Sequence, residues 1–444
     1  MNRTSESIPG LSRRTLLKQG LFAGGALAAP SLLSACSSGS DGSAGGPLSL
    51  VGWRFAPEIV QQHVKRFEGL YSEKVSYELV AGEYPSVVET KLIGGQNYDM
   101  LYAEESHYER WLEGRWTRTL EDLPGAQDMK GQLAPSAVQG LSTRDGELVA
   151  LPYYSGHYSF YYNEEHTSQL PGFSPPETWE DLMEMSREIK SRGIAEYPFL
   201  SNWGASWAFL SWALFGMWYS EGEPVFDEGD NPTFGNGDSG FTKVLTWCKD
   251  MFDEELIPPD ALTYLEEPLS MFQSGQHTFL IRSDYDQKVL NDPADSRIAG
   301  AVKNAMMPGS SGETFAWTSG YLMGADAPED RAWELLKFFG GKAKDGKFHV
   351  SKRWALDFGL GTPWKDLADD PDVVAAWEKW RDLDVHRKQS EASRPRAVSK
   401  ALWFPEWDTE MMSGVQEYLQ GKTEVGPLAE GLAARAKELK AAQG

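Results

Sequence analysis

Residues 48–103 have the sequence LSLVGWRFAPEIVQQHVKRFEGLYSEKVSYELVAGEYPSVVETKLIGGQNYDMLYA, and their hydrophobic pattern predicts the fold. Short apolar or alternating runs indicate strands, and runs with apolar side chains on one side indicate helices. The predicted elements, in order, are a strand at 48–53, a helix at 57–71, a strand at 75–80, a helix at 85–93 and a strand at 98–103. Alternating strands and helices of this length predict a parallel sheet of the α/β class.

This predicted sheet also indicates where a ligand would bind, because parallel sheets bind ligands outside the carboxyl ends of their strands. Three side chains follow the three strand ends: Trp53, Glu83 and Glu104. An indole ring can stack on a ligand, and a carboxylate can accept hydrogen bonds from hydroxyl groups. The alternative is that Trp53 packs in the core and that the two carboxylates are solvated loop charges.

Further along the chain, the pattern predicts separate strands at 147–154 and 159–163. It also predicts a helix that starts at Thr178, which would be the N-cap, with Asp181 three residues on.

Residues 1–35 have the features of an export signal. The run SRRTLLK at 12–18 matches the twin-arginine pattern, and the apolar run at 21–33 is shorter than the ~20 residues that span a bilayer. The run LSAC at 33–36 resembles a lipobox, which predicts that Cys36 carries the lipid that anchors the protein to the cell membrane. The alternative is an ordinary cysteine in a cleaved signal. Residues 36–47 are rich in Gly and Ser and are expected to form a flexible tether.

Cysteine content and charge exclude several classes of protein. The chain has two cysteines, and a lipidated Cys36 cannot form a disulfide with Cys248 or join it in a metal cluster. We expect Cys248 to be a small buried residue on a helix. The 444 residues carry a formal net charge of −23 and show no basic stripe, so nucleic acid is not an expected partner. The length predicts two domains.

Blocks spread along the rest of the chain resemble the extracellular solute-binding protein family 1, the sugar-binding relatives of maltodextrin-binding proteins. The similar blocks are GGQNYDMLYA (94–103), WLEGRW (111–116), DGELVALPYY (145–154), YYN (161–163), PETWEDL (176–182), FQSGQ (272–276), WTSGY (317–321) and AWELLKFF (332–339). Each block alone is a weak signal, and their shared order and spacing carry the resemblance.

The resemblance implies a two-lobed α/β fold of the periplasmic-binding-protein type, with hinge strands between the lobes and ligand bound between them. The implied boundaries are 48–154 with 309–344 for lobe 1, and 155–308 with 345–444 for lobe 2. The implied function is the substrate-binding component of an ABC importer, capturing a mono- or oligosaccharide. Such a protein is no enzyme, needs no cofactor or metal, works as a monomer and has the importer's transmembrane subunits as partners.

The resemblance also extends the set of candidate ligand-binding residues. The additional candidates are Tyr154 at the hinge, Trp203 after a strand end, Asp284 and Tyr285 where the family often has Gly-x-Trp, Trp317 at a strand entry, and Trp403 in a C-terminal loop. For Tyr154, Trp203, Trp317 and Trp403 the alternative is packing, and for Asp284 it is a solvated loop charge. If Trp317 faces the cleft, Trp317→Ala should weaken binding and leave the fold intact; if it packs, the melting temperature should fall instead. Two departures from the family pattern, the polar run at 282–284 and Ser319 in place of a glycine, bear on the choice of ligand.

Two other functions remain open from the sequence. The same fold could bind a peptide, a polyamine or chelated iron, and the pairs Tyr153-Tyr154 and Tyr161-Tyr162 give iron a little support. A lipid-anchored glycosidase would need two suitably spaced carboxylates, which the sequence does not single out. The sequence contains no Gly-x-Ser-x-Gly, His-Glu-x-x-His, P-loop or strand-linked Gly-x-Gly-x-x-Gly motif.

Overall fold

A computed structural model describes residues 45–81, 83–206, 208–235 and 237–443. The predicted export signal, the lipid attachment site at Cys36 and residues 36–44 of the predicted tether lie outside these residues. Within the described ranges, every helix is too short or too polar to cross a membrane.

The predicted parallel sheet is present at the start of the described chain. Its elements are β1 (Leu48–Gly52), α1 (Pro57–Tyr71), β2 (Val75–Leu79), α2 (Tyr84–Ile93) and β3 (Met100–Ala103). β1 pairs in parallel with both neighbours, with Leu50 opposite Tyr77 on one side and Met100 on the other. All four residues of β3 are buried, because β3 has a paired strand on each side and is covered on both faces. The three carboxyl ends therefore meet at one edge.

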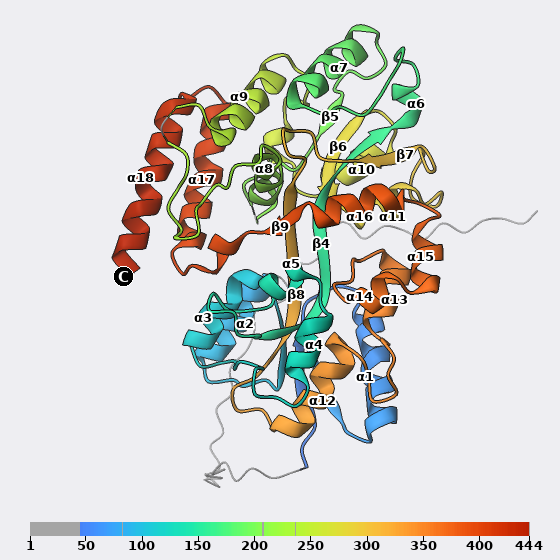
Figure 1. Cartoon of the computed structure of the whole chain (residues 1–444), viewed down its shortest axis with the longest axis vertical. Helices are drawn as coiled ribbons and strands as arrows, with labels where there is room; N and C mark the ends of the chain where they lie inside the picture. The colour runs from blue at the N-terminus through green and yellow to red at the C-terminus, as the bar shows by residue number, and fades with distance from the viewer. Residues whose placement is uncertain (1–44, 82, 207, 236, 444) are drawn as a thin grey trace, which may run out of the picture. The chain divides into compact units, whose positions relative to one another are not determined.

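Two long strands connect the two lobes of the molecule (Figure 1). The sequence pattern predicted separate strands at 147–154 and 159–163, whereas the structure has a single strand, β4 (Ala150–Asn163). From Ala150 to His157, β4 pairs with the antiparallel strand β8 (Thr314–Met323). From Tyr158 onward, β4 pairs with β6 (Phe279–Ser283), and from Phe160 also with β7 (Val302–Ala305). β4 thus changes partner between His157 and Tyr158.

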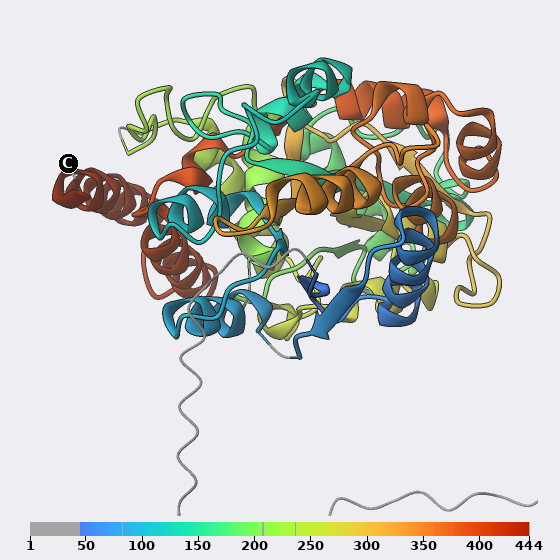
Figure 2. The same ribbon diagram turned by 90° about the horizontal axis from the view of Figure 1, so that it is seen from below.

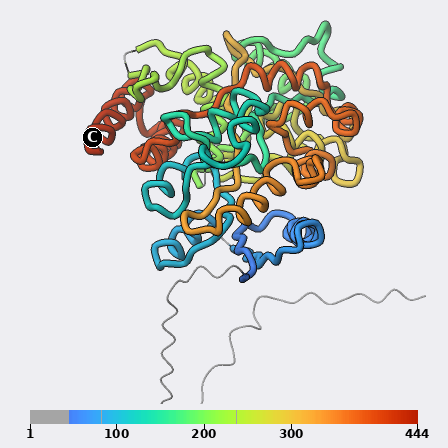
Figure 3. The backbone as a smooth tube through the Cα atoms, turned by 60° about the horizontal axis from the view of Figure 1, so that its bottom comes forward, coloured from blue at the N-terminus to red at the C-terminus, as the bar shows by residue number. Residues whose placement is uncertain are grey.

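The first lobe is the group of elements around β1–β3, and its sheet is completed late in the chain. The strand order is β2-β1-β3-β8-β4-β6-β5, so β8 lies between β3 and β4. The helices that follow β3 are α3 (Tyr108–Glu113), α4 (Ala126–Gln132) and α5 (Pro135–Gly140). Helix α12 (Glu329–Gly340) packs against α1, β3 and β8, and its orange tube lies beside the blue and cyan segments in Figure 3.

The second lobe is the group of elements around β5 (Phe199–Leu200), β6 and β7. Its helices are α6 (Glu164–Thr167), α7 (Trp179–Ser191), α8 (Phe209–Ser220), α9 (Gly240–Asp253), α10 (Glu267–Gln273) and α11 (Asp286–Leu290). Helix α7 begins as the sequence predicts, because the Thr178 side chain accepts a hydrogen bond from the Asp181 amide in a capping box. Helix α8 is buried on nearly all sides and packs on both β4 and β8, so it lies where the lobes meet.

The C-terminal part of the chain is mostly helical. It contains α13 (Ser351–Phe358), α14 (Lys365–Ala368), α15 (Pro371–Trp377), α16 (Leu383–Glu391), β9 (Ser393–Pro395), α17 (Phe404–Leu419) and α18 (Val425–Gln443). β9 pairs in parallel with β8, and α18, whose end is marked C, lies at the left end of the ribbon in Figure 2. Within this part, Trp354 of α13 packs against Phe55 and Tyr153. The lobe boundaries derived from the family resemblance remain a prediction.

Candidate functional site

A cavity of about 380 Å³ lies at the carboxyl ends of the first-lobe strands and is closed on one side by α8. It is lined by Trp53, Arg54, Glu83, Tyr84, Pro85, Tyr102, Ala103, Glu104, His107 and Trp111 from the first lobe, and by Ala208, Phe209 and Trp212 at α8. The structure therefore brings together the three side chains that follow the predicted strand ends. The volume is near the lower end of the ~300–1,000 Å³ range of small-molecule sites.

Aromatic rings form the walls of this cavity. The ring of Trp53 is stacked on Tyr102, with centroids 5.3 Å apart and an interplanar angle of 7°, and on Phe55 at 5.5 Å. The hydroxyl of Tyr84 donates to the carbonyl oxygen of Tyr102 at 2.9 Å. Because Tyr102 fixes one face of the Trp53 ring, the half-buried indole is held at the edge of the cavity.

Glu104 places a carboxyl group in the same cavity. Burial raises the pKa of Glu104 to about 7, and the positive charge of Arg396 partly opposes this shift. The neighbouring Glu105 also has its pKa raised to about 7 by burial, against the charges of Lys400 and Arg396. Burial lowers the pKa of His107, so this ring is neutral at pH 7. The cavity thus combines aromatic faces with hydrogen-bonding groups.

A second cavity, of about 180 Å³, lies beside the point where β4 changes partner. Its lining includes Gly156, His157, Asp284, Trp317 and His386. Gly156 lets the Trp317 ring lie against β4, because a Cβ there would come within 2.6 Å of that ring. A third, much smaller cavity is lined by Glu104, Trp212, Trp317, Ser319 and Arg396 among others, so it shares walls with the other two.

Three of the predicted site residues form one aromatic cluster at the hinge. The ring centroid of Tyr154 lies 6.1 Å from that of Tyr285 and 6.4 Å from that of Trp317, and the last two are also 6.4 Å apart. Trp317 is 6% exposed and Tyr154 is 9% exposed. These rings are therefore more buried than side chains that simply face an open cleft, and their contact with a ligand remains a prediction.

Two further predicted residues lie apart from these cavities. Trp203 is 1% exposed and packs against Phe199 and Phe252. Trp403 is buried beside Phe226 and Phe404, at the start of α17. Neither residue lines any of the three cavities described above, and both positions match the packing alternative.

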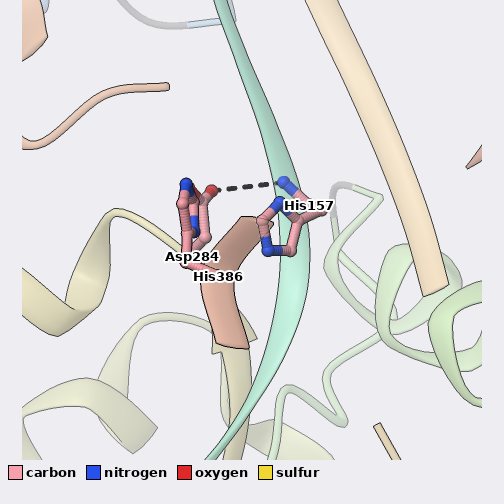
Figure 4. Close-up of side chains that lie close together, drawn as sticks. All are labelled: His157, Asp284 and His386. Carbon is pink, nitrogen blue, oxygen red and sulfur yellow. Dashed lines mark hydrogen bonds and ion pairs between the residues drawn. The ribbon is translucent and has the colours of Figure 1, made fainter. Parts of the chain in front are cut away.

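A cluster of possible metal ligands lies at the hinge (Figure 4). His157, Asp284 and His386 offer ligand atoms that all lie within 4.8 Å of one another. The amide of His157 donates to Oδ1 of Asp284 at 3.2 Å. However, the buried guanidinium of Arg381 lies 3.6 Å from Oδ2 of Asp284, and its Nη1 lies 2.8 Å from Nδ1 of His386. A cation of the chain itself already balances the carboxylate, so a divalent ion would add uncompensated buried charge.

Sequence reasoning missed Trp212 and His107. Trp212 belongs to a helix whose residues are apolar on nearly all sides, so no periodicity separates a cavity-facing ring from a core ring. His107 lies four residues after the end of the third strand. The rule that ligands bind at the carboxyl ends of parallel strands, which identified Glu104, could therefore also have identified His107.

The part of the chain that matches a family model includes the cavity-lining residues from Glu83 to Trp212, while Trp53 and Arg54 lie just before it. Residues 56–345 match the model of the bacterial extracellular solute-binding protein family. A curated relative, the sn-glycerol-3-phosphate-binding periplasmic protein UgpB of Brucella abortus (strain 2308), is 26% identical over 155 residues. That match covers 33% of this chain and 36% of the relative. The UgpB protein of Agrobacterium fabrum is 32% identical over 76 residues, which is 17% of each chain. The chain thus matches about a third or less of the length of these relatives.

Solved structures match nearly the whole chain. The maltose-bound MalE3 of T. maritima has a TM-score of 0.74 and 19% identity, and the match covers 88% of this chain and 99% of that one. A solute-binding protein of Agrobacterium radiobacter K84 in complex with ribitol has a TM-score of 0.72 and 20% identity, covering 89% and 99%. At this identity the likeness shows the two-lobed fold. On the family match, the chain belongs to the bacterial extracellular solute-binding proteins.

Proposed function

We propose that the chain is the substrate-binding component of an ABC importer and captures a mono- or oligosaccharide between its lobes. The observation that carries this proposal is the cavity at Trp53, where first-lobe strand ends face Trp212 of α8. Sugars present apolar CH faces and a rim of hydroxyls, which suit indole rings and carboxylates respectively. Two proteins of similar structure, one bound to maltose and one to ribitol, support this class of solute.

Within this proposal, Trp53, Glu83 and Glu104 contact the solute from the first lobe, and Trp212 contacts it from the second. Tyr154, Asp284, Tyr285 and Trp317 surround the segment where β4 changes partner. Closure of the two lobes about this segment would bring the cavity walls of both lobes into contact with the solute. The other parts of the proposal are a lipid anchor at Cys36 on the extracytoplasmic face of the cell membrane, a monomeric state and delivery to the transmembrane subunits of the importer.

The experiment is a thermal-shift screen of residues 45–444 against neutral sugars, followed by calorimetric titration of each hit. A ligand at 100 times its Kd stabilises a protein by ~2.7 kcal/mol. We expect Trp53→Ala to weaken binding of a hit about ten- to hundredfold, as loss of an aromatic anchor does. Trp116→Ala is the matched control, because this half-buried Trp lies in the first lobe and lines none of the three cavities.

Two further measurements test whether the lobes close on the sugar and whether the protein is a binding protein or a glycosidase. Small-angle scattering should give a smaller radius of gyration with the sugar bound, because the solute contacts both lobes only when they close. The recovered sugar should be chemically unchanged, whereas a glycosidase would return cleaved products. If no sugar binds, or if the bound sugar is hydrolysed, the proposed function is wrong.

A further inference from the structure

Among the described residues that line the cavity at Trp53, Glu104 is the one acidic residue that is partly buried. Of the described residues that line it, Glu83 and Glu104 are acidic and Arg54 is the basic one. Glu83 and Arg54 are both exposed residues at the rim, where water screens their opposite charges. His107 adds no charge at pH 7, because burial lowers its pKa. When it is ionised, Glu104 is therefore the charge that a solute meets inside this cavity, and it would repel an anionic solute.

The carboxyl group of Glu104 is available to bind the solute. No described side chain forms a hydrogen bond or ion pair with it, although the neighbouring charge of Arg396 acts on it. Arg396 lines the adjoining small cavity together with Glu104, but its Nη1 lies 3.5 Å from Oδ1 of Asp408 and also contacts the hydroxyl of Ser211. The guanidinium further lies over the rings of Phe215 and Phe404. A carboxylate that is partly removed from water and lacks a cationic partner favours a positively charged ligand.

The aromatic walls favour the same kind of ligand. Trp53 is fixed against Tyr102, and Trp212 is fixed against Trp317 with an interplanar angle of 11°. Both indoles line the cavity that contains Glu104. Indole faces attract cations through the ring quadrupole, and aromatic walls combined with a carboxylate are a common environment for ammonium groups.

We propose that this cavity selects a solute with an ammonium group, which pairs with Glu104 while Trp53 and Trp212 cover its apolar faces. This inference rests on the proposed function of the same site and deepens it. The ammonium group can belong to an amino sugar or to a polyamine. sn-Glycerol 3-phosphate, for which the Brucella abortus relative is named, belongs to the opposite charge class and is expected not to bind.

The test is calorimetric titration of residues 45–444 with matched probes at pH 7.5, above the pKa of about 7 to which burial raises Glu104. The probes are D-glucosamine, D-glucose, N-acetyl-D-glucosamine, putrescine and sn-glycerol 3-phosphate. We expect glucosamine to bind at least tenfold more tightly than glucose and N-acetylglucosamine, and glycerol phosphate not to bind. Glu104→Gln should reduce the glucosamine preference to less than threefold. Glu113→Gln, at an exposed carboxylate of the first lobe that does not line the cavity, should retain it.

The outcomes separate this inference from the proposed function. Equal binding of glucose and glucosamine overturns the ammonium preference and leaves sugar capture in place. Binding of putrescine without any sugar supports the ammonium group and overturns sugar capture. Binding of glycerol phosphate, or of none of the five probes, overturns the inference. The comparison of glucosamine with N-acetylglucosamine uses the unsubstituted protein, so it decides the question even if Glu104→Gln fails to fold.

Discussion

The indole rings of Trp212 and Trp317 lie nearly parallel, with centroids 5.9 Å apart and an interplanar angle of 11°. Trp212 comes from α8, which follows β5 of the second lobe, and Trp317 comes from β8, which completes the sheet of the first. Each ring lines a cavity of its own, and both line the small cavity at Glu104. This pair therefore links the packing of the hinge to the proposed solute site.

Trp317→Ala should lower the free energy of unfolding by about 3–5 kcal/mol, as removal of a buried large side chain does. The ring is 6% exposed and packs against Tyr158, Phe315 and Trp212. Urea denaturation measures the loss, and a midpoint within experimental error of the wild type would contradict it. The sequence alone predicted the opposite, that the fold would survive this change with weakened binding, because it placed Trp317 at an open cleft edge.

The Glu105 carboxyl should contribute a loss of stability as pH rises from about 4.5 to 7, while histidines whose pKa burial lowers, such as His63 and His386, contribute a gain over part of this range. Burial raises the pKa of Glu105 to about 7, so the folded state retains a proton that the unfolded state has lost in this window. The stabilisation is therefore fully present below about pH 4.5 and is lost as pH passes through 7. One such proton gives a slope of about −1.4 kcal/mol per pH unit.

Denaturation curves at several pH values would measure this slope. Glu105→Gln should make the slope of stability against pH more positive than that of the wild type, because the amide keeps the size of the side chain and cannot titrate. The charged groups that act on Glu105 are Lys400, Arg396 and Glu104, so Glu104 should account for part of the remaining slope. Identical slopes for wild type and Glu105→Gln would show that Glu105 titrates normally.

Asp284→Ala should cost about 3–5 kcal/mol of stability, because it leaves the buried guanidinium of Arg381 without its carboxylate. Asp369→Ala is the control, since this exposed carboxylate lies 3.4 Å from Arg387 in a similar pair on the surface. We expect the control to change stability by no more than ~0.5 kcal/mol. Equal effects of the two substitutions would mean that the hinge pair contributes no more than a surface pair.

Cys36→Ser should release the protein from the membrane fraction or leave its precursor uncleaved. The reason is that the lipid predicted on Cys36 replaces the apolar run at 21–33 as the anchor. Cell fractionation and the electrophoretic mobility of the product measure the effect, with Cys248→Ser as the control for loss of a thiol. Unchanged fractionation and mobility of the Cys36 variant would rule out the lipid anchor.

The sequence predicted the first lobe well because its signals are local. The periodicity at 57–71 coincides with α1, and the capping pair Thr178 and Asp181 marks the start of α7. The predicted break in β4 was wrong, because the sequence does not show that β8 and then β6 supply partners along its whole length. A strand that exchanges partners without interruption is a tertiary property.

Only some of the predicted site residues share a cavity, because the position of the others also depends on tertiary packing. Trp53, Glu83 and Glu104 follow strand ends, so the rule for parallel sheets was enough to place them around one cavity. Trp203 also follows a strand end, yet it lies in the core against Phe199 and Phe252. A Trp that follows a strand end can line a cavity or pack in the core, and the residue type does not indicate which. That depends on α9 and the residues after it, which pack over this part of the second lobe.

The place of β8 in the sheet has a consequence for how the chain folds during synthesis. β8 fills the gap between β3 and β4, but the ribosome makes it roughly 210 residues after β3, which takes about 10–40 s at ~5–20 residues per second. Until then the apolar strand at Met100–Ala103 has an open edge, and such edges invite aggregation. The newly made chain must therefore be protected at this edge until residue 323 has emerged.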